Sequence, residues 1–210
     1  MALFHVATLT PSKTEMIEGW IPTQTWGPRA DQPIEVVGAF RFDDPEGMVG
    51  IETHIVRAGG TLYQVPLTYR NEALEGADDA LLGTMEHSAL GTRWVYDGLG
   101  DDRYLTMLAA VAMTGQGEAL GLAEHEGRWY VAPANVRIEG GGWTGRRVPL
   151  DRFEAVGEEA DVTILRNDGF ELRFHRRPAS GSRPDLGLAA TWEGQDHPVV
   201  LAQVVPLGAR

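Results

Sequence analysis

Cysteine is absent from this chain of 210 residues. Its absence excludes disulfides, thiolate nucleophiles, and the zinc and iron–sulfur sites that cysteine holds. Lysine is nearly absent as well, since Lys13 is the single one in the sequence. Its neighbours, Pro-Ser-Lys-Thr-Glu, lack the glycines with which phosphate-binding loops expose their backbone amides. The sequence therefore offers no nucleotide-binding lysine of the P-loop or protein-kinase kind.

Long apolar runs and positive charge are also scarce. No apolar run approaches the roughly 18 residues of a membrane span, and no charged leader precedes an apolar segment at the start. The formal net charge is −12, whereas binding to nucleic acid or anionic lipid requires a positive surface. We therefore expect a cytoplasmic protein without nucleic-acid or membrane partners. With 43% hydrophobic residues, the chain can bury a core without covalent staples.

Known catalytic motifs are missing too. The sequence contains no His-x-Asp loop followed by Asn, no metal-binding Asp-Phe motif and no Gly-x-Ser-x-Gly elbow. The triplet Asp168-Gly169-Phe170 resembles a scrambled kinase motif, but Asn167-Asp168-Gly169 is typical of a hairpin turn. None of the six histidines has the spacing of a metal ligand pair. We therefore assign no catalytic residue, metal or cofactor.

The first half of the chain predicts a mixture of short helices and strands. Thr10 and a Ser12-x-x-Glu15 pattern indicate the start of a helix. Residues 34–42 predict a strand, and residues 49–56 and 62–69 predict a hairpin. Pairing Ile55 with Tyr63 would give this hairpin one apolar face, and its other face would then be polar, made of Glu52, His54, Gln64, Thr68 and Arg70. Residues 81–96 are compatible with either a helix or a strand.

Further on, a helix gives way to strands. Asp101 or Asp102 is expected to cap a helix that runs to about Met113, with a buried stripe made of Leu105, Leu108, Ala109 and Ala112. Gly115-Gln116-Gly117 is the best boundary in the chain, so we predict two domains, 1–114 and 118–210. Beyond it, strand patterns are expected at 120–123, 129–132, 135–139, 162–166, 170–175, 189–192 and 199–205. The two halves form either separate domains or one shared curved sheet, and the fold class is α+β.

The run from Val65 to Asp97 combines aromatic, acidic and basic residues in an order that composition does not explain. Its parts are Pro66–Arg70, Gly83–Ser88, Leu90-Gly91 and Arg93–Asp97. This pattern resembles the maltokinase N-terminal cap family, in particular small actinobacterial proteins that carry the cap without the kinase. The resemblance implies a cystatin-like first half, with a helix on an antiparallel sheet, followed by a small antiparallel β-rich half. It also implies a non-catalytic role linked to trehalose, maltose or glucan metabolism.

This run, together with Glu52 upstream of it, supplies the candidate ligand-binding residues, which are Glu52, Tyr69, Arg70, Glu86, His87, Arg93, Trp94 and Asp97. Two interpretations of this set stay open. The charged members form an ion-pair network that fixes the packing, because buried arginines need carboxylate partners. Alternatively, Tyr69, Trp94 and Tyr96 form the aromatic walls of a polar pocket suited to a sugar.

Three functions remain open at this point. The first is a non-catalytic accessory or binding protein with a protein partner or self-association, and the second is a free-standing module for a small carbohydrate or metabolite. The third is an enzyme of unfamiliar design that uses Glu86, His87 and Arg93. In the second half, Trp129, Trp143 and Trp192 are candidates for stacking on carbohydrate. A predicted cationic patch consists of Arg173, Arg176 and Arg177.

Overall fold

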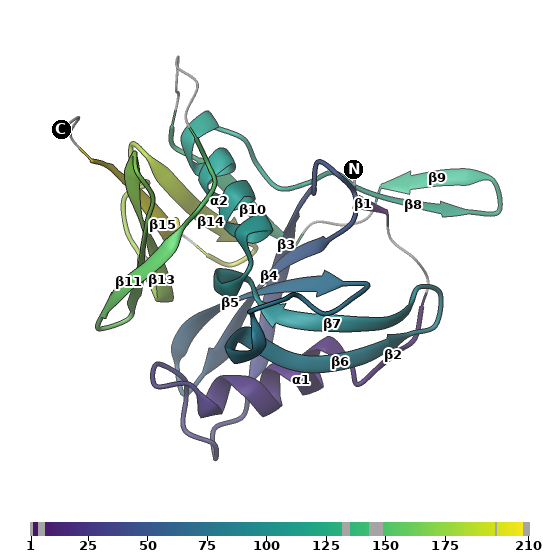
Figure 1. The fold of residues 1–210 in the computed structure, drawn as a ribbon. Coiled ribbons are helices and arrows are strands. Elements are labelled where there is room, and N and C mark those ends of the chain that lie inside the picture. The colour runs from purple at the N-terminus through teal and green to yellow at the C-terminus, as the bar shows by residue number, and fades with distance from the viewer. Residues whose placement is uncertain (1, 4–6, 132–134, 143–148, 196, 208–210) are drawn as a thin grey trace.

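The computed structural model describes residues 2–3, 7–131, 135–142, 149–195 and 197–207. This part of the chain is mostly β, with two α-helices, and belongs to the α+β class that the sequence predicts. Two six-stranded antiparallel sheets form the body, with helix α2 between them, and a smaller three-stranded sheet projects away from it (Figure 1). No helix in these residues is both long and apolar enough to cross a membrane.

The first sheet is curled, with the strand order β2-β6-β7-β5-β4-β3. Its strands are β2 (Leu9–Thr10), β3 (Glu35–Phe42), β4 (Gly50–Ala58), β5 (Thr61–Arg70), β6 (Leu81–His87) and β7 (Gly91–Asp97). Residues 81–96, which the sequence left open, are therefore a hairpin. Helix α1 (Lys13–Trp20) packs its buried Met16 and Ile17 against one face of this sheet, in a core that also contains Ile21, Trp26, Val56, Tyr63, Val65 and Leu67.

Ser12 caps helix α1. Its side chain accepts from the Glu15 amide at 3.2 Å, and the Glu15 carboxylate accepts from the Ser12 amide at 2.7 Å. This is the capping box that the Ser12-x-x-Glu15 pattern predicts, since each side chain satisfies a backbone donor that the helix leaves free. The cap lies at Ser12 rather than Thr10, which belongs to β2.

The predicted register of the β4–β5 hairpin is wrong by one residue. Ile55 lies opposite Gln64, and Tyr63 lies opposite Val56. The turn consists of Gly59 and Gly60 alone, both with positive φ, instead of the five residues that we expected. Such a turn suits glycine, and shortening it moves each partner by one position. Both faces of this hairpin are buried, so the contrast between an apolar and a polar face could not show which of the two registers is correct.

The second sheet has the order β10-β14-β15-β13-β12-β11. Its strands are β10 (Val136–Gly140), β11 (Glu154–Glu159), β12 (Val162–Arg166), β13 (Phe170–Ser180), β14 (Gly187–Trp192) and β15 (Val199–Pro206). Asn167-Asp168-Gly169 forms the expected turn, in which Asn167 Oδ1 accepts from the amides of Gly169 and Phe170. Sequence reasoning missed β11, whose residues are all exposed, and it ended β13 five residues too early.

Helix α2 (Asp102–Thr114) connects the two large sheets. Asp101 caps it, and the predicted stripe of Leu105, Leu108, Ala109 and Ala112 is buried. These side chains share one hydrophobic core with Ile51 and Ile55 of the first sheet and with Phe170, Leu172 and Phe174 of the second. The halves therefore share a core while their sheets remain separate. The domain boundary at residues 115–117 stays a prediction.

The C-terminal end of α2 touches the second sheet through backbone. The amide of Gly142 donates to the Ala112 carbonyl at 3.0 Å, and the amide of Gly140 donates to Gln116 at 3.0 Å. A Cβ atom at Gly140 would lie 2.0 Å from the Val111 carbonyl oxygen, far inside van der Waals contact. The glycine run at 140–142 thus serves a close approach of helix and strand.

The third sheet consists of β1 (Ala2–Leu3), β8 (Gly121–His125) and β9 (Arg128–Val131). The hairpin β8–β9 is called the arm below, and it extends away from the body in Figure 1. Its side chains Trp129 and Val131 are 60% and 71% exposed, and Tyr130 is also exposed. An apolar surface of this kind on a projecting edge strand is unusual in a monomer.

Candidate functional site

A cleft of about 500 Å³ opens in the first sheet, and we call it the Glu52 cleft after the carboxylate beside it. The start of α1, the loop that joins β3 to β4, the end of β5 and the β6–β7 hairpin contribute its walls. Its polar and charged lining comes from Lys13, Arg41, Asp43, Asp44, Tyr69, Asn71, His87 and Arg93. Apolar lining comes from Ala7, Leu9, Phe42, Met48, Val49, Ile51, Met85 and Leu90. This mixture of apolar walls and a few convergent polar groups is typical of small-molecule sites.

Glu52 is the buried anion of this region, with a side chain 8% exposed. Its Oε2 pairs with Lys13 and accepts from the Tyr69 hydroxyl at 3.2 Å, and His54 Nε2 lies 3.2 Å from the same oxygen. Arg41 lies directly opposite Glu52 in the β3–β4 pair. Cations therefore surround the carboxylate, as a buried charge requires.

These contacts decide the protonation state of the cluster. Burial alone would raise the pKa of the Glu52 carboxyl, but His54, Lys13 and Arg41 hold that pKa well below its ordinary 4.5. Burial, and then the Glu52 charge, raises the pKa of Tyr69 well above its ordinary 10.0. Glu52 is therefore an anion at neutral pH, and Tyr69 is a neutral phenol that donates to it.

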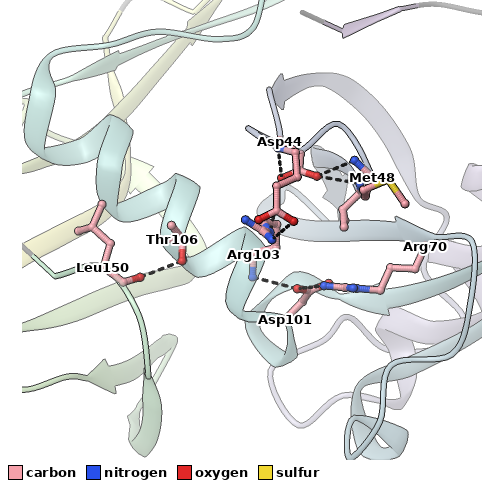
Figure 2. A network of polar contacts seen from close by, with 9 residues as sticks. Asp44, Met48, Arg70, Asp101, Arg103, Thr106 and Leu150 are labelled. Carbon is pink, nitrogen blue, oxygen red and sulfur yellow. Dashed lines mark hydrogen bonds and ion pairs between the residues drawn. The ribbon is translucent and has the colours of Figure 1, made fainter.

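One wall of the cleft is the loop between β3 and β4, which Asp44 holds in shape. Its Oδ2 accepts from the amides of Met48 at 2.8 Å and Val49 at 3.0 Å, and its Oδ1 lies 3.4 Å from Arg103 Nε. Figure 2 shows this contact together with the bidentate pair of Arg70 with Asp101. Both arginine–aspartate pairs therefore connect the N-terminal end of α2 to the first sheet next to the cleft.

The opposite wall is the β6–β7 hairpin. Arg93 donates from Nη2 to the Leu90 carbonyl at 2.9 Å, and its Nε is buried without a hydrogen-bond partner among the described residues. His87 Nδ1 accepts from the amides of Ala89 and Leu90, both at 3.2 Å. Arg93 therefore lines the cleft and carries one N–H donor that has no partner among the described residues, and Lys13 lines the cleft as well.

The structure brings part of the predicted residue set together. Tyr69, His87 and Arg93 line the cleft, and Glu52 contacts two lining residues, Lys13 and Tyr69. The other members, Arg70, Glu86, Trp94 and Asp97, are not among the residues that line it. Glu86 is exposed and accepts from the Thr92 hydroxyl at 2.8 Å. Tyr96, which we expected as an aromatic wall, is buried and does not line the cleft, and its hydroxyl accepts from the Leu74 amide at 2.8 Å.

The predicted ion-pair network does not form in the expected combination. Arg70 pairs with Asp101, which sequence reasoning treated as a helix cap alone, and Arg93 pairs with neither Glu86 nor Asp97. Asp97 instead binds Arg176 of the second sheet, with Nη1 3.1 Å from Oδ1 and Nη2 donating to Oδ2. The arginines have carboxylate partners, but from sequence-distant elements that local spacing does not indicate.

The cationic patch predicted at Arg173, Arg176 and Arg177 is also wrong. Arg176 is buried, and Arg173 pairs with Glu171 at 2.6 Å. Arg177 donates to the Trp26 carbonyl at 2.8 Å and lies 3.2 Å from Asp161. Each of these charges is therefore neutralised by the protein. The alternation of β13 could have shown this for Arg176, since it continues the buried positions of Phe170, Leu172 and Phe174.

The tryptophans of the second half lie in different settings. Trp129 is exposed on the arm, and Trp192 is half-buried and packs against the shared core. Trp143 lies outside the described residues. Trp129 and Trp192 therefore belong to different surroundings and do not form a common stacking surface.

Sequence reasoning missed Lys13 and Arg41 as members of the site. Lys13 looked like an isolated helix residue, and Arg41 was one position of a predicted strand. Arg41 could have been found by pairing the predicted strand 34–42 with the hairpin, because that pairing places it opposite Glu52. Lys13 could not, since its place depends on how α1 packs on the sheet.

The buried carboxylates predict how stability depends on pH. Arg70 lowers the pKa of Asp101 against the opposing effect of burial, and the pKa of Glu52 is lowered further. Because both values are lower in the folded chain, the stabilisation is present above the ordinary values of 4.5 and 3.8 and is lost as pH falls through the folded ones. We expect urea midpoints that are flat from pH 7 to about pH 5 and fall below about 4.5. Glu52→Gln should weaken this fall, and an unchanged pH profile in that variant would contradict the assignment.

In the described residues, no group of three or more histidine and carboxylate side chains could hold a metal ion. Glu86, His87 and Ser88 do not form a relay, because Ser88 Oγ accepts from the Thr8 amide and His87 Nδ1 accepts from its own turn. The arrangement provides hydrogen-bond donors and apolar walls for a bound molecule.

Comparison with protein families identifies one part of the chain. Residues 20–101 match the model of the maltokinase N-terminal cap domain, which is the family that the pattern at 65–97 resembles. The match covers β3 to β7 and ends at the cap residue of α2. A search of curated proteins finds no match. Residues 20–101, less than half of the chain, are therefore similar to maltokinase N-terminal cap domains.

Proposed function

We propose that this chain is a non-catalytic binding protein linked to trehalose, maltose or glucan metabolism, and that the Glu52 cleft holds a small carbohydrate or metabolite. The link to this metabolism rests on the cap domain at residues 20–101. The observation that carries the binding role is the cleft itself, about 500 Å³ in volume and lined by Lys13, Tyr69 and Arg93. Its volume lies in the range of sites for small molecules.

The chemistry of the cleft supports a hydroxylated ligand. Charged hydrogen-bonding groups converge there beside apolar walls from Leu9, Met48 and Met85. A sugar has both kinds of surface, because its ring carbons are apolar and its rim carries hydroxyls. Helix α1 on the antiparallel sheet supports the cystatin-like arrangement that we propose for this half. The cleft lies at the N-terminal end of this helix, whose first residue is Lys13.

Calorimetric titration tests the proposal with maltose, trehalose, maltotriose, glucose 6-phosphate and glucuronate. We expect at least one of them to bind saturably. Tyr69→Leu should abolish that binding, because Tyr69 lines the cleft and orients Glu52. Trp94→Leu is the matched control, since Trp94 is an aromatic residue of the same sheet that does not line the cleft.

The outcome can contradict the proposal in two ways. If none of the five compounds binds, the Glu52 cleft is not a site for such metabolites. If Trp94→Leu abolishes binding while Tyr69→Leu leaves it intact, with both variants folded by circular dichroism, the ligand binds elsewhere. Turnover of ATP and maltose that survives repurification would favour an enzyme instead.

A specific observation favours the accessory role as a second candidate. The arm exposes Trp129, Tyr130 and Val131 on an edge strand, which is a surface suited to another protein. Because residues 20–101 are similar to the maltokinase cap domain, a maltokinase is the partner that we propose to test. Binding to an immobilised maltokinase that weakens steeply with salt and is lost in Trp129→Ala would favour this role, since the chain carries a net charge of −12.

A further inference from the structure

We infer that the ligand of the Glu52 cleft carries an anionic oxygen group, a carboxylate or a phosphate, and that Arg93 is its main contact. This inference rests on the proposed function, because it names the chemistry of the molecule in the same cleft. It follows from asking which hydrogen-bonding groups of the cleft are already occupied by the protein and which are not.

The buried acids beside the cleft are occupied. Asp44 has a side chain 1% exposed, and its oxygens receive the amides of Met48 and Val49 and face Arg103. The Oε2 of Glu52 receives Lys13, Tyr69 and His54, in a side chain 8% exposed. Both oxygens of Asp44 and the Oε2 of Glu52 therefore serve the protein's own donors.

The unused capacity belongs to donors instead. Arg93 Nε is buried and has no acceptor among the described residues, while its Nη2 is held by the Leu90 carbonyl. That single bond leaves the guanidinium four further N–H bonds. Lys13 has a side chain 29% exposed, and its ammonium carries three N–H bonds, one of which suffices for Glu52. A ligand of the cleft is therefore expected to supply hydrogen-bond acceptors.

Charge decides which acceptor fits best. A buried donor without a partner costs free energy, and an acceptor that binds the Arg93 guanidinium offsets part of this cost. Hydrogen bonds between a guanidinium and a carboxylate or phosphate are roughly twice as strong as neutral ones, and they are often bidentate. The buried apolar lining residues Ile51 and Met85 lower the local dielectric, so the difference between anion and hydroxyl is larger there than at an open surface. An anionic group is thus favoured over a sugar hydroxyl.

Calorimetry with the purified protein tests this inference with maltose as neutral probe and glucose 6-phosphate, glucuronate and inorganic phosphate as anionic probes. We expect at least one anionic probe to bind at least about tenfold more tightly than maltose, since that corresponds to one additional charge-assisted contact. Glucose 6-phosphate against glucuronate then distinguishes phosphate from carboxylate as the preferred group. Arg93→Gln should reduce this affinity at least about tenfold, whereas Arg57→Gln, at an arginine of the same sheet outside the cleft, should not.

A second pair of variants protects the test if Arg93→Gln fails to fold. Leu90 is 44% exposed at the rim of the cleft, so both Leu90→Glu and Leu90→Gln should fold. Leu90→Glu should weaken the anionic probe several-fold more than Leu90→Gln does, because only the first adds a repelling charge. If maltose binds as tightly as the anions and these variants do not discriminate, the inference is overturned while the proposed function stands. If no probe binds, the inference is overturned, and the proposed function fails as well if trehalose and maltotriose do not bind either.

Discussion

Replacing Arg176 by alanine should lower the free energy of unfolding by about 3–5 kcal/mol, because it leaves Asp97 as a nearly buried and unpaired charge. The guanidinium is 6% exposed and the carboxylate 13% exposed. The same side chain stacks on Trp26, with its central carbon 4.6 Å from the ring centroid, and contacts Phe174 at 5.3 Å. Its loss therefore removes packing as well as charge. Urea denaturation at pH 7 measures the change.

Arg183→Ala is the matched control. Arg183 also pairs with a carboxylate, that of Glu139, but the two side chains are 45% and 66% exposed. Exposed pairs of this kind contribute about 0–1 kcal/mol, so the control should lose little stability. Replacing both Asp97 and Arg176 by apolar residues should cost less than the sum of the two single changes, since no unpaired charge then remains. Equal losses for Arg176→Ala and Arg183→Ala would contradict the assignment.

Tyr104→Ala should be comparably severe, at about 3–5 kcal/mol, the range for removing a large buried aromatic side chain. Tyr104 of α2 is fully buried, with its ring 6.0 Å from that of Phe42 and 6.4 Å from that of Phe174, measured between centroids. It therefore contacts an aromatic residue of each large sheet. The change creates a cavity at the meeting point of both halves. Chemical denaturation followed by tryptophan fluorescence measures it.

Tyr104→Phe isolates the hydroxyl. This group lies 2.8 Å from the hydroxyl of Thr53, which is fully buried. Removing it leaves the Thr53 hydroxyl without this partner at a cost of about 1–3 kcal/mol, clearly less than the alanine change. Tyr130→Ala, on the exposed strand of the arm, should stay within about 0.5 kcal/mol. A Tyr104→Phe variant as unstable as Tyr104→Ala would show that the ring contributes little.

The sequence prediction was correct where local patterns determine the structure. The stripe Leu105, Leu108, Ala109 and Ala112 has the helical period, and Phe170, Leu172 and Phe174 have the strand period, so both elements were recognised. The capping box at Ser12 is local as well. The β4–β5 register was missed because burial on both faces removes the contrast that the prediction relied on.

Long-range contacts limited the prediction of the site. Tyr69, His87 and Arg93 were singled out from the run 65–97 and do line one cleft, and Glu52 contacts it through Tyr69. The partners that define their chemistry come from elsewhere, with Lys13 placed by a helix 39 positions away from Glu52. Arg176 reaches Asp97 across 79 positions, a separation at which spacing carries no information. Pairing of this kind follows only from the assembled fold.

The two ends of helix α2 contact different parts of the molecule. At one end Arg103 faces Asp44, whose loop forms a wall of the cleft, and at the other end backbone atoms of Gly140 and Gly142 press directly on the helix. The 13 residues between them make a rod about 20 Å long. We therefore expect a displacement of the cleft wall to be passed along α2 to the second sheet.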